Sequence, residues 1–165
     1  MSIITVTPFL WFDDDAEEAI ERYVKVFPDT EIIDETRMPD GSLFMSTIRI
    51  QGQTLVLMNG GPAHPHTDAF SLSVGVDTQE EVDAISGGLI DGGGEQGPCG
   101  WLKDGFGLSW QIVPSALGRL MGDPDQGKAG RVREAMMQMK RLDIQALQDA
   151  HDGRQRFEAG ERMPN

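Results

Sequence analysis

Apolar and polar positions along the chain follow two spacings, and each spacing predicts one kind of element. Alternation over four to eight residues predicts a strand with one buried face, and a spacing of three to four predicts an amphipathic helix. Asp15 and Glu18 have the spacing of a capping box, which predicts a helix start, and Pro28 ends that helix. Around this helix the same criteria predict strands over residues 5–12, 31–37, 42–50 and 54–59.

The same order of elements begins again near residue 70. Thr78 and Glu81 form a second capping-box pattern after an alternating strand, and a glycine run at 92–94 follows the second helix. Asp14-x-x-Glu17-Glu18 and Asp77-x-x-Glu80-Glu81 echo each other, which indicates a duplicated strand–helix–strands unit. The second unit is shorter, so we expect one of its strands to be vestigial. Its strands are predicted over residues 70–76, 99–103 and 108–113.

After Pro114 the spacing becomes helical. Val132, Ala135, Met136, Met139 and Leu142 form one apolar stripe, and Asp143 is expected to cap a further helix. We therefore predict an α+β fold in a single domain, with C-terminal helices and then a loosely ordered tail. The predicted ranges are 1–152 for the domain, about 3–60 and 69–113 for its two modules, about 114–151 for the helices and 153–165 for the tail.

Composition narrows the range of partners and locations. The chain has 165 residues and a formal net charge of −13, so nucleic acids and anionic membrane surfaces are not expected as partners. Its single cysteine, Cys99, excludes a disulfide within the chain, and we interpret it as a structural thiol. With no signal-like or membrane-spanning apolar run, the expected location is the cytoplasm.

Several segments together resemble one known family. They are the opening Thr7-Pro8-Phe9-Leu10-Trp11-Phe12, the segment Asn59-Gly60-Gly61-Pro62, the stretch from Cys99 to Pro114 with Cys99-Gly100-Trp101-Leu102-Lys103-Asp104, and Ala135-Met136-Met137-Gln138-Met139. Over residues of about 3 to 150, the chain is similar to PhnB-like proteins of the vicinal-oxygen-chelate (glyoxalase/bleomycin-resistance) superfamily. The resemblance implies two βαβββ modules that form a cupped mixed β-sheet around a pocket, in a homodimer. It does not imply a reaction, because function depends on the site rather than the fold.

The residues leave the choice of chemistry open. Many members of the superfamily hold a divalent metal with His or Glu on the first strand of each module and on a late strand. Here residues 5–12 contain no such side chain, and the late-strand position carries Gln111. We therefore predict no cofactor, with a glyoxalase-type metal-dependent lyase or isomerase using His64, His66 and Gln111 as the alternative. Relatives are also labelled demethylubiquinone methyltransferases, but the glycines at 92–97 follow a helix, which is the wrong context for a nucleotide loop.

Aromatic residues on the predicted strands offer a binding surface for a small organic ligand. An apolar pocket with a few polar groups is the usual small-molecule site. Trp110 and Gln111 are neighbours in one strand, so only one of them faces the pocket. No catalytic residue is identified from the sequence. The predicted ligand-binding residues are Trp11, Asn59, His66, Trp101 and Gln111.

Overall fold

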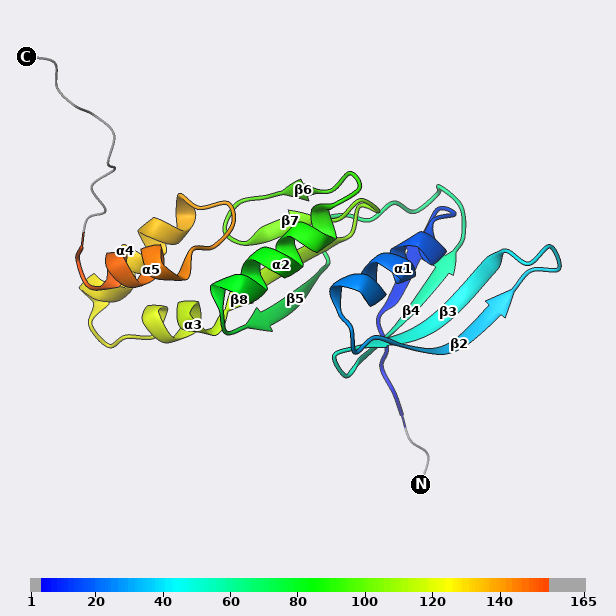
Figure 1. Ribbon diagram of the computed structural model, residues 1–165, viewed down its shortest axis with the longest axis horizontal. Coiled ribbons are helices and arrows are strands. Elements are labelled where there is room, and N and C mark those ends of the chain that lie inside the picture. The colour runs from blue at the N-terminus through cyan, green and yellow to red at the C-terminus, as the bar shows by residue number, and fades with distance from the viewer. Residues whose placement is uncertain (1–3, 155–165) are drawn as a thin grey trace, which may run out of the picture.

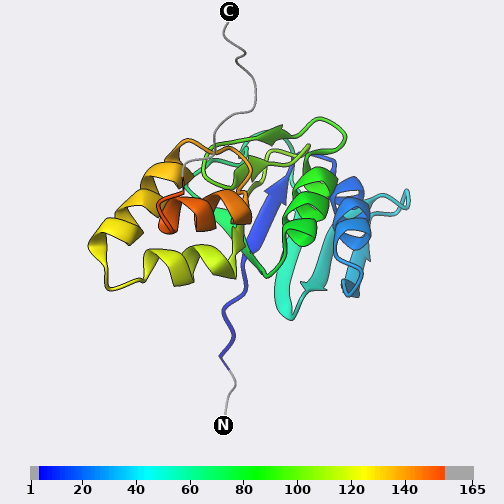
Figure 2. The same ribbon diagram turned by 60° about the vertical axis from the view of Figure 1, so that its left-hand side comes forward.

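A computed structural model describes residues 4–154 of the chain, as two sheet-and-helix modules followed by three helices (Figures 1 and 2). The first module contains β1 (Phe9–Phe12), α1 (Ala16–Val26), β2 (Glu31–Arg37), β3 (Leu43–Ile50) and β4 (Gln53–Asn59). The second contains β5 (Ser71–Val76), α2 (Gln79–Ile90), β6 (Glu95–Gln96), β7 (Trp101–Lys103) and β8 (Ser109–Pro114). The C-terminal helices are α3 (Ser115–Met121), α4 (Gln126–Met137) and α5 (Ile144–His151).

Each module forms a four-stranded mixed sheet with one helix on one face. The strand orders are β1-β4-β3-β2 and β5-β8-β7-β6, and in each sheet the first strand runs parallel to the fourth. The identical order confirms the duplicated α+β architecture predicted from the sequence. The vestigial strand of the second module is β6, which has two residues.

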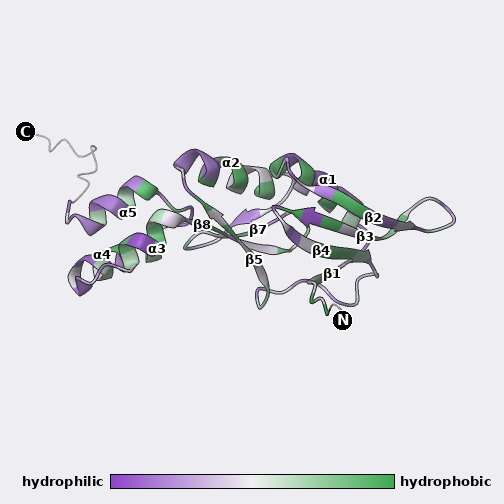
Figure 3. Ribbon diagram, turned by 90° about the horizontal axis from the view of Figure 1, so that it is seen from below, coloured by the Kyte–Doolittle hydropathy of each residue, from purple (hydrophilic) through white to green (hydrophobic). Residues whose placement is uncertain are grey.

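Alternation in the strands decides which side chains enter the core. Leu10 and Phe12 of β1 and Leu55 and Leu57 of β4 are buried beneath the apolar face of α1. In the second module, Trp110 and Ile112 of β8 are buried in the same core. Figure 3 shows α1 and α2 on one side of the sheets, so the opposite sides are not covered by these helices.

Two details of the first helix and strand differ from the prediction. Residues 4–8 are not part of β1, because the parallel register with β4 begins at Phe9 and Val56. The side chain of Asp15 makes no capping hydrogen bond, and the backbone N–H of Ala16 instead donates to Asn59 Oδ1 at 2.9 Å. The strand partner β4 therefore supplies the cap that the local sequence was expected to supply.

The capping box of the second helix is confirmed. Thr78 accepts a hydrogen bond from the backbone N–H of Glu81, and the Glu81 side chain accepts one from the backbone N–H of Thr78. The glycine run follows α2 as a turn into β6. The strand predicted over residues 31–37 is β2 with the same bounds, and β3, β4, β5, β7 and β8 differ from the predicted ranges by one or two residues at their ends.

The two modules meet through their helices and a shared core. Tyr23 of α1 donates a hydrogen bond of 2.7 Å to Asp104, which lies in the turn between β7 and β8. Arg22 forms an ion pair with Asp91 at the end of α2, with 2.6 Å between Nη1 and Oδ2. Figure 1 shows α1 and α2 next to each other, each on its own sheet, and the contact between the two helices joins the modules. One continuous hydrophobic core therefore spans both modules.

The C-terminal helices form a smaller unit with its own core. Its buried residues are Leu117, Leu120, Val132, Leu142 and Leu147. The apolar stripe predicted over residues 132–142 is not one helix, because α4 ends at Met137 and Leu142 lies in the connection to α5. Asp143 caps α5 as predicted, accepting a hydrogen bond from the backbone N–H of Ala146. Of the predicted tail, residues 155–165 lie outside the described residues.

His151, at the end of α5, lies between two carboxylates. Its Nε2 is 2.8 Å from Asp123 Oδ2 and its Nδ1 is 3.0 Å from Asp152 Oδ1. Ionised carboxylates only accept hydrogen bonds, so both contacts require the doubly protonated imidazolium ring. The hydrogen bonds to Asp152 and Asp123 raise the pKa of His151.

This arrangement predicts a pH dependence of stability. A raised pKa in the folded state contributes stability that is fully present below the unfolded pKa of about 6.5 and is lost as the pH rises through the folded pKa. We expect the free energy of unfolding of wild type to fall over that window relative to His151→Gln, in urea titrations at stepped pH. Burial lowers the pKa of His66, which gives the opposite sign, but His66 is common to both proteins and cancels. Parallel pH profiles for the two proteins would contradict this prediction.

Candidate functional site

The faces of the sheets that point away from α1 and α2 carry the candidate site. In the second sheet, Trp101 and Gln111 are direct cross-strand partners on β7 and β8, and so share one face. Lys103 and Ser109 are the corresponding partners two residues along. Because Leu102 and Trp110 lie between these positions and are buried in the core, the four other side chains point to the open face.

A cavity of about 450 Å³ opens on this face. Ser109 donates a hydrogen bond of 2.9 Å to Asp68 Oδ1, and the same oxygen lies 3.1 Å from Lys103 Nζ. The hydrogen bonds from Lys103 and Ser109 lower the pKa of Asp68, so its carboxylate stays ionised at neutral pH. Beside this polar cluster, half-buried Trp101 supplies an aromatic wall. The cavity is lined by Asp68, Glu95, Gly97, Pro98, Trp101, Leu102, Lys103 and Ser109.

Of the neighbours Trp110 and Gln111, it is Gln111 that faces the open side. Its Nε2 donates a hydrogen bond of 2.9 Å to the hydroxyl of Ser71 on β5. Trp110 is 1% exposed and packs in the core, stacked on Phe27 and edge-on to Tyr23. The alternation resolves the choice between the two residues that the sequence left open.

Trp11 lies on the open face of the first sheet. Its indole N–H donates a hydrogen bond of 2.7 Å to the carbonyl of Gly61, and His64 meets its ring edge-on with 4.9 Å between centroids. A side chain at Gly60 would overlap the indole ring, so glycine is required for this packing. Trp11 is thus held in a fixed orientation by the loop after β4.

Asn59 and His66 lie on the helix-facing side of the first sheet. Both ends of the Asn59 carboxamide are used, because Oδ1 accepts from Ala16 and Nδ2 donates to the carbonyl of Leu43. His66 packs edge-on against buried Phe12, and its Nε2 is buried without a hydrogen-bond partner among the described residues. Burial lowers the pKa of His66, which keeps the ring neutral near neutral pH.

The residues named for a metal site do not converge. His64 and His66 contact Trp11 and Phe12, which are consecutive in β1 and therefore point to opposite faces of the sheet. Gln111 belongs to the other sheet. Within residues 4–154, no three His, Cys, Asp or Glu side chains gather closely enough to hold a metal ion. The donor set of the lyase alternative is therefore dispersed.

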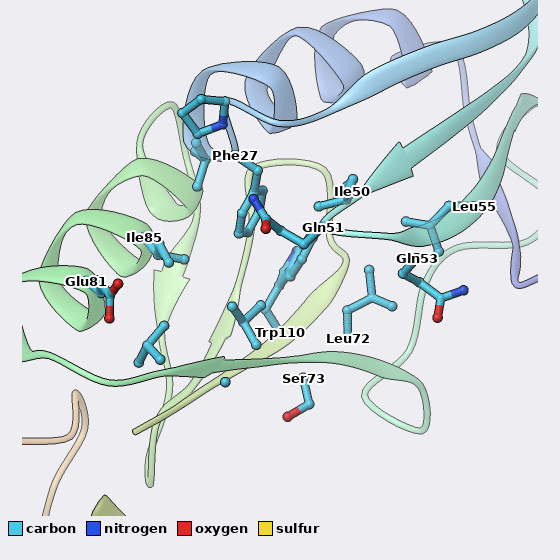
Figure 4. Close-up of a pocket in the computed structure, with 15 residues that line it drawn as sticks. Phe27, Ile50, Gln51, Gln53, Leu55, Leu72, Ser73, Glu81, Ile85 and Trp110 are labelled. Atoms are coloured by element: carbon cyan, nitrogen blue, oxygen red, sulfur yellow. The ribbon is translucent and has the colours of Figure 1, made fainter. Parts of the chain in front are cut away.

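A second cavity of about 490 Å³ lies between the modules (Figure 4). It runs along β5, where Leu72 and Ser73 line it, and Trp110 lies at its base. Gln51 and Gln53 at the β3–β4 hairpin form its opposite wall. Within the described residues, β5 has no hydrogen-bonded strand on this side, because it is the end strand of its sheet.

The polar cluster of Asp68, Lys103 and Ser109 was not predicted from the sequence. Asp68 is 41 residues from Ser109, and no local pattern relates the two positions. The one available signal was alternation from Trp101, which places Lys103 on the same face. Asp68 reaches the sheet through a turn just before β5, and no spacing pattern in the sequence predicts this turn.

None of the helices among residues 4–154 is long and apolar enough to cross a membrane. A search of curated proteins gave no match to the chain. Solved structures give fold matches. The PhnB protein from Bacillus cereus is 28% identical with a TM-score of 0.59, and all of it aligns with 68% of this chain.

Two further structures are under 25% identical and so support the fold alone. Protein PA1353 from Pseudomonas aeruginosa has 20% identity and a TM-score of 0.54, with 68% of this chain and 98% of that one covered. The fosfomycin resistance protein FosX from Listeria monocytogenes, solved with Mn(II) and sulfate, has 18% identity and a TM-score of 0.50, with 68% and 92% covered.

The family model described as 3-demethylubiquinone-9 3-methyltransferase matches residues 4–113, which is the two-module part of the chain. That match ends before α3, so the methionine-rich segment at 135–139 lies outside it. Together with the paired modules and the PhnB structure, the match shows that the chain belongs to this family, in the PhnB-like branch of the vicinal-oxygen-chelate superfamily.

Proposed function

We propose that this protein binds a small, partly apolar organic molecule on the open face of its second sheet. The observation that carries the proposal is the cavity of about 450 Å³ beside Trp101, which has the size of a small-molecule pocket. A planar or aliphatic portion of the ligand would pack against the indole ring. Polar groups of the ligand would meet Lys103 and Ser109, which line the cavity, and Gln111 lies on the same face of the sheet next to Trp101.

Binding rather than turnover is favoured by the charges around the cavity. Lys103 is engaged with Asp68, and the pKa of Asp68 is lowered, whereas a general acid requires a raised value. Gln111 carries no charge at the position where a carboxylate would serve as a metal ligand or base. The family description names a methyl transfer, but Gly92, Gly94 and Gly97 follow α2 rather than a strand. Saturable binding of S-adenosylmethionine in calorimetry would contradict the present proposal and favour methyl transfer.

The ligand site is tested by a fragment screen on wild type and Trp101→Ala. We expect fragments detected by ligand-observed NMR to bind the variant at least about tenfold more weakly, which is about 1.4 kcal/mol, because the indole wall is lost. Phe44→Ala removes an exposed aromatic ring from β3 in the other sheet and is the matched control. Fragments that keep their affinity in Trp101→Ala and lose it in Phe44→Ala would place the site elsewhere.

A homodimer is the proposed assembly, with the β1 edge of one chain against the β5 edge of the other. Both strands are the end strands of their sheets, and unpaired edges invite pairing with another chain. The segment before β1 presents Ile4 and Val6, which are 88% and 94% exposed. The groove along β5 is largely apolar and offers a surface that such residues would cover. This pairing would join the two open faces into one cup.

The assembly is tested by Val6→Glu. A buried charge without a partner is costly, so we expect the variant to shift from dimer toward monomer in analytical ultracentrifugation at micromolar concentration. Ile33→Glu, in the opposite edge strand β2, is the control, because Ile33 is also exposed but lies away from the proposed interface. A monomeric wild type, or a dimer disrupted by Ile33→Glu alone, would argue against this interface.

A further inference from the structure

The helices α3–α5 lie beyond the residues that the family model matches, yet the connection between α4 and α5 contacts the turn that leads into Trp101. The backbone N–H of Cys99 donates to the carbonyl of Met139 at 2.8 Å, and that of Gly100 donates to the carbonyl of Lys140 at 2.7 Å. These two bonds join the connection between α4 and α5 to the turn before β7. The neighbours Gly97 and Pro98 line the cavity beside Trp101.

This turn has an unfavourable backbone conformation. Cys99 has φ of +56°, in the left-handed region that side-chain-bearing residues rarely adopt. Such a conformation persists where the surrounding structure holds it in place. Gly100 follows at φ +83°, and a Cβ there would lie 2.8 Å from the Ile112 carbonyl oxygen and 2.9 Å from Leu142 Cδ1. The turn is therefore packed tightly between β8 and the helical unit.

The helical unit is anchored to the second module at the same place. Gln79, in the first turn of α2, donates a hydrogen bond of 3.1 Å to the carbonyl of Leu142 and accepts one of 2.9 Å from the backbone N–H of Ile144. The segment 139–144 is thus held on one side by Gln79 and itself holds Cys99 and Gly100 on the other. In Figure 1 this segment approaches the β6–β7 end of the second sheet.

We infer that the C-terminal helical unit positions the Cys99–Gly100 turn and thereby sets the orientation of Trp101 in the cavity. That this cavity binds a ligand rests on the proposed function. The positioning of the Cys99–Gly100 turn is a property of the protein without ligand. Gln79 acts as a positioning residue through the segment 139–144. The residues that line the cavity all lie between Asp68 and Ser109, so the helical unit acts on the cavity indirectly, by holding the turn before β7 in place.

The single cysteine allows a direct test, because its reactivity reports on opening of the turn. We expect Gln79→Ala to increase the rate of modification of Cys99 by a thiol reagent about tenfold, since local opening controls access to a partly buried group. Gln145→Ala is the matched control, because the Gln145 carboxamide bonds Asp149 within α5. Its rate should match that of wild type.

A second readout follows Trp101 itself in a ¹H–¹⁵N spectrum. We expect its indole resonance to move in Gln79→Ala, while those of Trp11 and Trp110 stay, since their N–H groups bond Gly61 and Asp104. Gly100→Ala should give the same two effects, and Gly41→Ala should give neither. Gly41 has a similar φ of +89° with no atom near its Cβ position.

The inference is overturned if Gln79→Ala and Gly100→Ala leave both the thiol rate and the Trp101 resonance as in wild type. It is also overturned if the two control variants change them equally. Both measurements are made without any ligand. A failed fragment screen would therefore count against the proposed function and leave this result standing, and unchanged readouts with successful fragment binding would do the reverse.

Discussion

Replacing Asp104 by alanine is expected to lower the free energy of unfolding by about 4 kcal/mol, the largest effect of any single substitution considered for this protein. The carboxylate is 2% exposed and accepts four hydrogen bonds. Tyr23 and Trp110 donate to Oδ2 at 2.7 and 2.9 Å, and the backbone N–H groups of Phe106 and Leu108 donate to Oδ1 at 3.0 Å each. Alanine would leave these donors buried without an acceptor. Urea denaturation followed by fluorescence measures the change.

Two further variants separate the network from a general effect of removing a carboxylate. Tyr23→Phe removes one donor and should cost about 1–2 kcal/mol. Asp91→Ala removes the exposed partner of Arg22 and should cost much less than Asp104→Ala, because surface ion pairs contribute little. Equal losses for Asp104→Ala and Asp91→Ala would show that the buried network is not a major source of stability.

The network also explains why Gln111 points to the open face of the second sheet. Asp104 fixes the indole of Trp110 in the core, and burial together with Asp104 raises the pKa of Tyr23 well above its usual value, so its phenol stays protonated as a donor. With Trp110 held inward, the next residue along β8 must point outward. The orientation of the candidate site thus depends on a contact between the two modules, and stability and site geometry are coupled at Asp104.

The parts of the fold that could be predicted from the sequence are those with local causes. The strand over residues 31–37 and the capping box at Thr78 and Glu81 depend on neighbours within a few residues, and both appear with the predicted bounds and contacts. The order of elements repeated in the two halves was sufficient for the module architecture. Alternation along β8 also showed that only one of Trp110 and Gln111 could face the open side of the sheet, and the structure identifies it as Gln111.

The parts that could not be predicted depend on contacts between distant residues. Asn59 caps a helix 43 residues earlier in the chain, and Asp104 bonds a tyrosine 81 residues away. From the neighbouring residues alone, Asn59 and Asp104 would be interpreted as ordinary polar residues next to turns. The contact of His66 with Phe12 on the helix-facing side of β1 likewise joins residues 54 positions apart. Sequence spacing contains no information about such contacts.

The C-terminal helical unit has a small core, and this makes it the part of the described chain that is easiest to separate from the rest. Five buried residues form the core, and Leu142 among them is 1% exposed and lies against Gly100. The sheets share a larger core that includes Trp110 and Tyr23. Because stability differs between parts of a structure according to buried apolar contacts, the two regions need not unfold together.

Leu142→Ala is therefore expected to cost about 3 kcal/mol within the helical unit, through lost burial and the cavity left behind. We expect the helices to unfold before the sheets, so that the helical signal in circular dichroism falls at a lower urea concentration than the fluorescence of buried Trp110. Met137→Ala, at a side chain that is 63% exposed on α4, should leave the two transitions as in wild type. Coincident transitions in Leu142→Ala would mean that the unit and the sheets form one cooperative structure. In that case, positioning of the Cys99–Gly100 turn would be inseparable from folding of the whole protein.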